Sequence, residues 1–215
     1  MKVKRLMIPL VMALMAMFLL SSGASPALAA SKAFNYRFAG KGADAGWYSC
    51  EGDVCTYTSV YVADTMYRYD GTKMNGRSLS YSTSTYDPVN FAFSYSYGFV
   101  ENPTFSISKK LTAASVSASV PITTCSYNEM TGEETCIDGG IVQVNVTWTG
   151  IGDLIRGSSK GHYVSKNFTS NYSFKGTWRE ATAVGLINGN SPGEFGWGQI
   201  FDLKDSSMTS CHGSC

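Results

Sequence analysis

The sequence has few residues of the kinds that carry out catalysis. Among 215 residues there are two histidines, and the charged fraction is 15 %, well below the usual quarter or so. No metal-binding signature and no nucleophile motif is present, so we expect no cofactor and no metal. After Ala29 no segment has a helical period, and no apolar stretch approaches the length of a membrane span. These absences favour a non-catalytic β-protein.

The one long apolar run lies at the N-terminus. Residues 6–20 follow a basic start and precede small residues that end at Ala29, which is typical of a secretory signal peptide. An uncleaved anchor fits less well, because the run is short and no charged stop follows it. We therefore predict a signal peptide over residues 1–29 and a single secreted, extracellular domain over residues 30–215.

Removal of the signal peptide changes the charge balance. That segment contains three of the 17 basic residues and none of the 16 acidic ones, which leaves the mature chain with a net charge of −2. A near-neutral chain gives no electrostatic reason to expect nucleic acid or an anionic membrane as a partner. The partners we expect are a cell-wall or matrix polysaccharide, or further copies of the chain.

The main structural signal is alternation with a period of two residues. It runs through residues 91–99, where every odd position is aromatic, and through 111–122, 141–148 and 168–178. This pattern predicts half-buried strands with apolar side chains inward and Ser, Thr or Asn outward. Further strands are predicted near 34–39, 54–62, 66–69, 77–86, 161–165, 181–187 and 198–203.

Frequent turn signals separate these runs, and no linker divides the chain. We predict an all-β fold, an antiparallel two-sheet β-sandwich, with a lipocalin-like closed β-barrel as the alternative. A transmembrane barrel fits less well, because the polar faces are rich in Ser and Thr and the apolar faces mix Ala and Val as cores do.

The six cysteines form three close pairs in the sequence. In an exported chain an even number favours disulfides. Gly52-Asp53 is suited to a two-residue hairpin turn, which would place Cys50 directly opposite Cys55. A four-residue turn at 129–132 would likewise place Cys125 opposite Cys136. We predict both bridges.

The third pair lies in a short C-terminal tail, Cys211-His-Gly-Ser-Cys215. A terminal disulfide is the preferred interpretation, with His212 incidental. Two thiolates and an imidazole are also ligands for zinc or copper, but the spacing is not a standard zinc signature and a fourth ligand is missing locally. The two cysteines could instead cross-link other chains.

A stretch of the second half resembles uncharacterised secreted bacterial proteins. The resemblance covers residues 142–187, and its motifs are Thr147-Trp148, His162-Tyr163 and the aromatic run 168–178. It implies a secreted bacterial β-domain and carries no catalytic residues.

Groups for catalysis are scattered along the sequence. His162 lies in a basic loop near Asp153, Ser158 and Ser159, and we expect a solvated histidine there, because local spacing is no evidence of a triad. A glycosidase needs two converging carboxylates. The sequence offers four candidates for such a pair: Glu180, Glu194, Asp202 and Asp205.

The aromatic content is the most useful clue to binding, because flat amphipathic rings suit sugars as well as cores. Trp47, beside the first hairpin, and Trp197, between two glycines, are the candidate binding residues. We predict a non-catalytic protein of the cell surface or extracellular matrix that binds glycan or self-assembles. The alternatives are a small secreted polysaccharide hydrolase and a lipocalin-like carrier of a small apolar ligand.

Overall fold

The computed structural model describes residues 34–69, 72–128, 130–165 and 168–212, and all of its regular structure is β-strand. The strands are β1 (Phe34–Glu51), β2 (Val54–Tyr69), β3 (Thr72–Asp87), β4 (Ala92–Glu101), β5 (Thr104–Ile107), β6 (Ala113–Asn128), β7 (Glu133–Gly150), β8 (Ile155–Ser165), β9 (Phe168–Ile187) and β10 (Glu194–His212). The predicted all-β antiparallel fold is confirmed. In these ranges there is no helix of the length and apolarity that a membrane span requires.

All ten strands belong to one hydrogen-bonded sheet. Its order is β10-β1-β2-β3-β4-β6-β7-β9-β8, with β5 paired to β6 and a further pairing between β10 and β9. β9 holds the sheet together because it changes partners along its length: residues 168–180 pair with β10, and residues 181–187 pair with β7. The sandwich prediction expected two separate sheets. The hydrogen bonds instead connect all the strands into one sheet.

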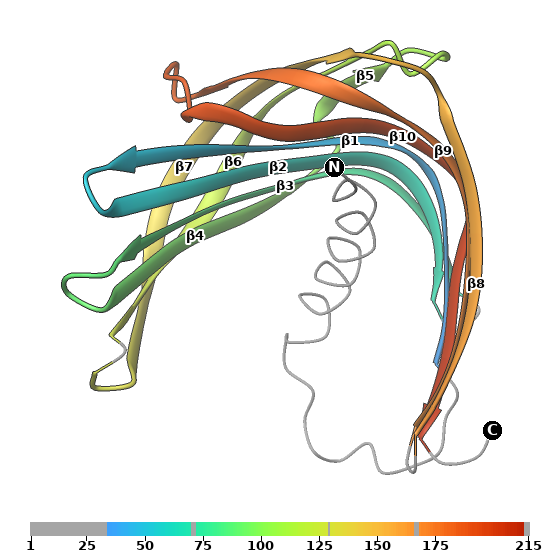
Figure 1. The fold of residues 1–215 in the computed structure, drawn as a ribbon, viewed down its shortest axis with the longest axis horizontal. Coiled ribbons are helices and arrows are strands. Elements are labelled where there is room, and N and C mark those ends of the chain that lie inside the picture. The colour runs from blue at the N-terminus through green and yellow to red at the C-terminus, as the bar shows by residue number, and fades with distance from the viewer. Residues whose placement is uncertain (1–33, 70–71, 129, 166–167, 213–215) are drawn as a thin grey trace, which may run out of the picture.

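The sheet has two regions, which Figure 1 shows as the upper part and the strands that curve down its right side. In the layered region, β5, β6, β7 and the second half of β9 pack over β1, β2, β3 and β10. The extension is a single layer in which the long strands continue beyond the core. It consists of residues 34–42, 63–69, 72–78, 155–165, 168–178 and 201–212.

The core fills the layered region. Trp47, Trp148 and Leu79 are its largest fully buried side chains, and valines of β2, β6 and β7 surround them. The Trp148 indole N–H donates a 2.8 Å hydrogen bond to the backbone carbonyl of Asp44, which joins β7 to β1 across the core. The alternative prediction of a lipocalin-like closed barrel is wrong, because these side chains fill the space in which such a barrel would hold its ligand.

The predicted inward faces of β6 and β7 are correct. Val116 and Val120 of β6 are buried, as are Val144, Val146 and Trp148 of β7. This agreement follows from the period of two: once one residue of a strand faces the core, its alternate neighbours do as well.

For β4 the predicted face is wrong. Gly98 and Val100 face the core, whereas Tyr97 and Phe99 are about half exposed, at 50 % and 53 %. The cause is close packing of β4 on β6, because a Cβ at Gly98 would overlap the backbone of Pro121 and the side chain of Val120. Tyr81, on the neighbouring strand opposite Gly98, is buried there.

β1 is much longer than predicted because aromatic rings cover its glycines. The Phe201 ring lies against Gly42, and a Cβ at Gly46 would be 2.5 Å from the Trp197 indole nitrogen. Glycine weakens a strand on its own, but it admits a large cross-strand ring close to the backbone. The strand therefore continues through Gly40, Gly42 and Gly46 to Glu51.

Two of the predicted disulfides are present. Cys50–Cys55 and Cys125–Cys136 each join residues directly opposite in a hairpin. Gly52 has a positive φ of 61° and Asp53 does not, as the predicted type II′ turn requires. The prediction for the third pair lies outside the described residues, because Cys215 is not among them and nothing is known of the Cys211 side chain.

Both disulfides should act as local staples of modest strength. Replacing Cys50 and Cys55 together with serine should lower the free energy of unfolding by about 2 kcal/mol, and the Cys125/Cys136 pair by about 3, because the loops they close are short. Urea unfolding of each double variant measures the difference. A loss above about 5 kcal/mol for either pair would contradict the local role.

Candidate functional site

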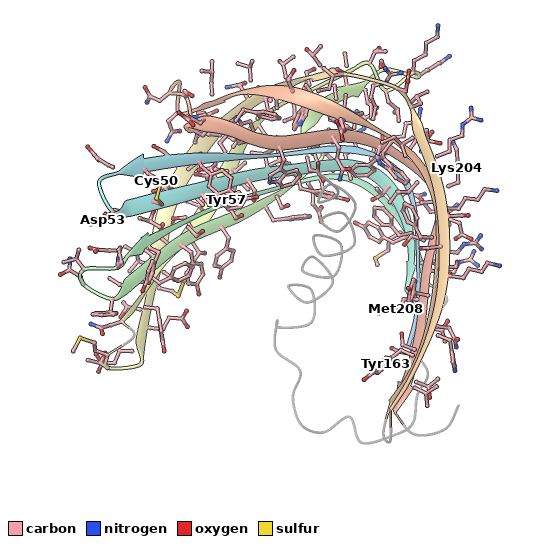
Figure 2. The ribbon with its side chains drawn as sticks, viewed as in Figure 1. Cys50, Asp53, Tyr57, Tyr163, Lys204 and Met208 are labelled. Carbon is pink, nitrogen blue, oxygen red and sulfur yellow. A yellow bond between two sulfur atoms is a disulfide. The ribbon has the colours of Figure 1, made fainter. Side chains whose placement is uncertain are left out.

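One side of the layered region is lined with aromatic rings. On β10, β1, β2, β3, β4 and the last residues of β6, the side chains that point away from the core lie on the inside of the bend, where Figure 2 labels Tyr57. We call this surface the aromatic face. Its rings are those of Tyr48, Tyr57, Tyr61, Tyr86, Phe93, Tyr95, Tyr97, Phe99, Tyr127 and Trp197.

A stripe of serines on β3 runs between two of the aromatic strands. Ser80 pairs with Tyr61 of β2 on one side and with Phe99 of β4 on the other. Neighbouring strands are about 4.8 Å apart, so the two strands that flank the stripe are separated by about 10 Å. The serine stripe consists of Ser80, Ser82 and Ser84.

The same arrangement recurs four residues along β3. There Ser84 lies between Tyr57 and Tyr95. Four residues of strand span about 13 Å, so four rings frame an area of about 10 by 13 Å with hydroxyl groups at its base. Ser82, midway, shares a 2.7 Å hydrogen bond with Ser59.

The rings on this face support one another. Tyr95 and Tyr97 stack with centroids 6.0 Å apart, and Tyr48 lies 5.0 Å from Tyr57. The Tyr95 hydroxyl donates a hydrogen bond to Glu134, and this bond raises the pKa of Tyr95 to about 12. Burial raises the pKa of Tyr57. Both hydroxyls therefore stay protonated at neutral pH. The Tyr95 hydroxyl already donates its single proton to Glu134, whereas the Tyr57 hydroxyl accepts from Trp197 and keeps its own proton for donation.

The two predicted binding tryptophans have different environments. Trp197 is on the aromatic face, where its indole N–H donates a 3.1 Å hydrogen bond to the Tyr57 hydroxyl. Trp47 is 2 % exposed and packs against Gly185 inside the core. The prediction for Trp47 needs correction, because a ligand could reach this ring only if the core opened.

Asp44 is a buried carboxyl at the edge of the aromatic face. Its Oδ2 accepts a 2.9 Å hydrogen bond from Gln199, while its Oδ1 has no protein partner among the described residues. Burial raises the pKa of Asp44 from 3.8 to about 7, although the hydrogen bonds from Gln199 act in the opposite direction. Sequence inspection missed this residue, since one aspartate in a strand gives no signal of burial.

The groups considered for catalysis do not come together. His162 contacts the side-chain oxygen of Asn171 at 2.6 Å, not a serine. Asp202 and Asp205 lie on the convex side of the bend in ion pairs with Lys204 and Arg37. Glu180 and Glu194 lie on the other face. Glu180 pairs with Gln199, and Glu194 is five residues from Gln199 along β10.

The tail histidine, His212, has no described side chain, so its predicted incidental role lies outside the described part of the structure. The described part also places one possible set of metal-ligating groups together, namely Cys125, Glu134 and Cys136. Both cysteines of this set are in a disulfide and have no thiolate to offer.

The sequence gives no relatives from which a function can be carried over. No protein-family model and no curated protein matches this chain. The resemblance of residues 142–187 to secreted bacterial proteins therefore stays a prediction. Any functional conclusion has to come from the chemistry of the surface.

Proposed function

We propose that this is a secreted, non-catalytic β-protein that binds glycan chains at the cell surface or in the extracellular matrix. The observation that carries the proposal is the aromatic face, with rings of β2 and β4 on both sides of the serine stripe. Sugars present C–H faces that pack on aromatic rings and hydroxyls that need hydrogen-bond partners. Tyrosine and serine supply both kinds of contact on one surface.

The location follows from two features. The predicted signal peptide directs export, and the Cys50–Cys55 and Cys125–Cys136 disulfides suit an oxidising compartment. Polysaccharides are abundant there. The uncharged serine stripe favours neutral sugar chains over polyanions, which require cationic groups.

A hydrolase and an apolar carrier each need a feature that this site does not supply. Hydrolysis by a carboxylate pair needs two acids about 5–10 Å apart. Asp202 and Asp205 are ion-paired on the convex side, and Glu180 and Glu194 are separated by five residues of strand, about 16 Å. A carrier needs an apolar cavity, and Trp47, Trp148 and Leu79 occupy the interior. Binding on the open face requires neither.

Replacing Phe99 with alanine should weaken glycan binding about tenfold. The ring is half exposed beside the serine stripe, and one ring contact contributes about 1.4 kcal/mol. Retention of the variant on the polysaccharide that binds the wild type measures the effect. Val184→Ala is the matched control, because Val184 is an exposed apolar residue on β9, away from this face.

The double variant Tyr97→Ala/Phe99→Ala should lose binding further. Equal losses in the Val184 control and the Phe99 variant would show that the contact is nonspecific. Unchanged retention of the double variant would contradict the proposed site.

A further inference from the structure

The two faces of the extension differ sharply in chemistry. The convex face carries the charges, including the ion pairs Arg37–Asp205 at 2.8 Å and Arg77–Asp64 at 2.9 Å. On the concave face, none of the side chains that the structure describes is charged. Those with large side chains are Phe38, Tyr67, Met74, Ile155, Tyr163, Tyr172, Phe174, Trp178, Phe201, Leu203 and Met208. Figure 2 shows Lys204 pointing away from the bend and Met208 pointing into it.

This concave face lacks a covering layer among the described residues. Tyr172 and Met74 are about half exposed, and the core cluster contains no side chain of the concave face, although Ala63, Thr65 and Phe201 are buried where this face meets the layered region. An amphipathic sheet is stabilised when another layer covers its apolar face. In the layered region, β6 and β7 cover β1, β2 and β3. Among the described residues, no such layer covers these strands where they continue into the extension.

We propose that the concave face of the extension packs against the same face of a second copy of this chain. Charge permits this pairing, because an uncharged face can meet its own copy without repulsion, as a two-fold interface requires. Charged partners such as nucleic acid or anionic lipid would find no ion pairs there. The pairing would bury Tyr172, Phe174 and Met208 in a second, intermolecular core.

The area is sufficient for a stable dimer. Six strands spaced about 4.8 Å apart give a width of about 29 Å, and eight residues of strand give a length of about 26 Å. The face therefore covers about 750 Å². A standard stable interface buries about 800 Å² on each partner.

Two copies of a sheet can also join through hydrogen bonds between their edge strands. The edges of the extension argue against this second mode of assembly. One edge is residues 72–77 of β3, with Lys73 and Arg77, and the other is β8, with Arg156 and Lys160. Joining the two edges would bring cations together. Lysine on an edge strand is a common device against such pairing. Face-to-face contact avoids this repulsion.

This inference goes beyond the proposed glycan binding, since it concerns a different part of the sheet. The test is the mass of the exported protein in solution by sedimentation equilibrium, with the full chain expressed in a host that secretes it. At tens of micromolar we expect a mass close to twice that of one chain. Tyr172→Lys should place two cations inside the interface and weaken the dimer at least 100-fold.

Asn171→Lys is the matched control. Asn171 is exposed one position away, on the opposite face, so the same charge there should leave the dimer intact. Met208→Lys is a second interface variant in case Tyr172→Lys does not fold, which circular dichroism will show. Retention of Tyr172→Lys on glycan should equal that of the wild type.

Three results would overturn the inference. The first is a monomeric wild type at 100 µM. The second is a dimer that Tyr172→Lys and Met208→Lys leave unchanged, which would place the interface elsewhere. The third is glycan retention that falls with Tyr172→Lys, because glycan would then occupy this face.

Discussion

Replacing Trp148 with alanine should lower the free energy of unfolding by about 4 kcal/mol, the expected cost of deleting a large core ring. Trp148 is fully buried on β7, and its indole N–H donates to the Asp44 carbonyl of β1. The change removes packing from both layers and leaves a buried carbonyl without its partner. The layered region depends on this contact more than on any exposed ring.

Urea unfolding followed by tyrosine and tryptophan fluorescence measures this loss. Trp148→Phe separates the two contributions, because it keeps most of the ring volume and removes the donor, and it should cost about half as much. Val184→Ala, at an exposed site, should change the stability by less than about 0.5 kcal/mol. A loss below 1 kcal/mol for Trp148→Ala would contradict the packing of β7 on β1.

Asp44→Asn should make the protein more stable at alkaline pH and leave it unchanged near pH 4. Burial raises the pKa of Asp44 to about 7 in the folded protein, whereas an unfolded chain has the ordinary value near 3.8. Between pH 4 and pH 7, Asp44 therefore keeps its proton in the folded state and releases it in the unfolded state. Stability therefore falls as the pH rises from about 4 to 7, and it is constant above that range.

The size of the effect follows from the same two values. They differ by about 3, and each pH unit corresponds to about 1.4 kcal/mol, so ionisation of Asp44 should cost the wild type up to about 4 kcal/mol at pH 8. Asparagine has the shape of the carboxyl and keeps an acceptor for Gln199, but it does not ionise.

Unfolding free energies of both proteins at pH 4, 6 and 8 test the prediction. The two curves should meet at pH 4 and separate by a few kcal/mol at pH 8, with the variant higher. Parallel curves would show that Asp44 is not buried as described. A wild type more stable than the variant at pH 8 would contradict the raised pKa of Asp44.

The sequence was sufficient for features that depend on neighbouring residues. The Gly52-Asp53 turn sets the register of its hairpin, so the position of Cys50 opposite Cys55 could be predicted from six residues. Likewise, the alternation of β7 identified its buried face, because Val144 and Val146 have no equally apolar residues between them.

Features that depend on distant pairings were not accessible in this way. In β4 either the odd-numbered or the even-numbered residues could face the core. The sequence favours the odd-numbered residues, because they are aromatic. In the structure the even-numbered residues face the core, because Gly98 allows β6 to approach. The small residues at Ser94, Ser96 and Gly98 were the one available sign. The frame of rings around the serine stripe requires the register of β2, β3 and β4, which no single segment contains.

The candidate tryptophans illustrate the same limit. Trp47 and Trp197 lie beside glycines in similar surroundings along the sequence, yet one faces the core and the other the aromatic face. Trp197 lies directly opposite Gly46, the neighbour of Trp47, so the alternation of β1 places the two rings on opposite faces. Which residue of β10 lies opposite Gly46 depends on a pairing between distant segments, which neither segment specifies alone.

The central claim is that the aromatic face binds glycan without cleaving it. Its most direct test is incubation of the purified exported protein with a panel of insoluble polysaccharides and cell walls, scoring both bound protein and released sugar. We predict retention on at least one polysaccharide, loss of that retention in Tyr97→Ala/Phe99→Ala, and no released sugar. Retention on none of them, or release of soluble products, would contradict the account.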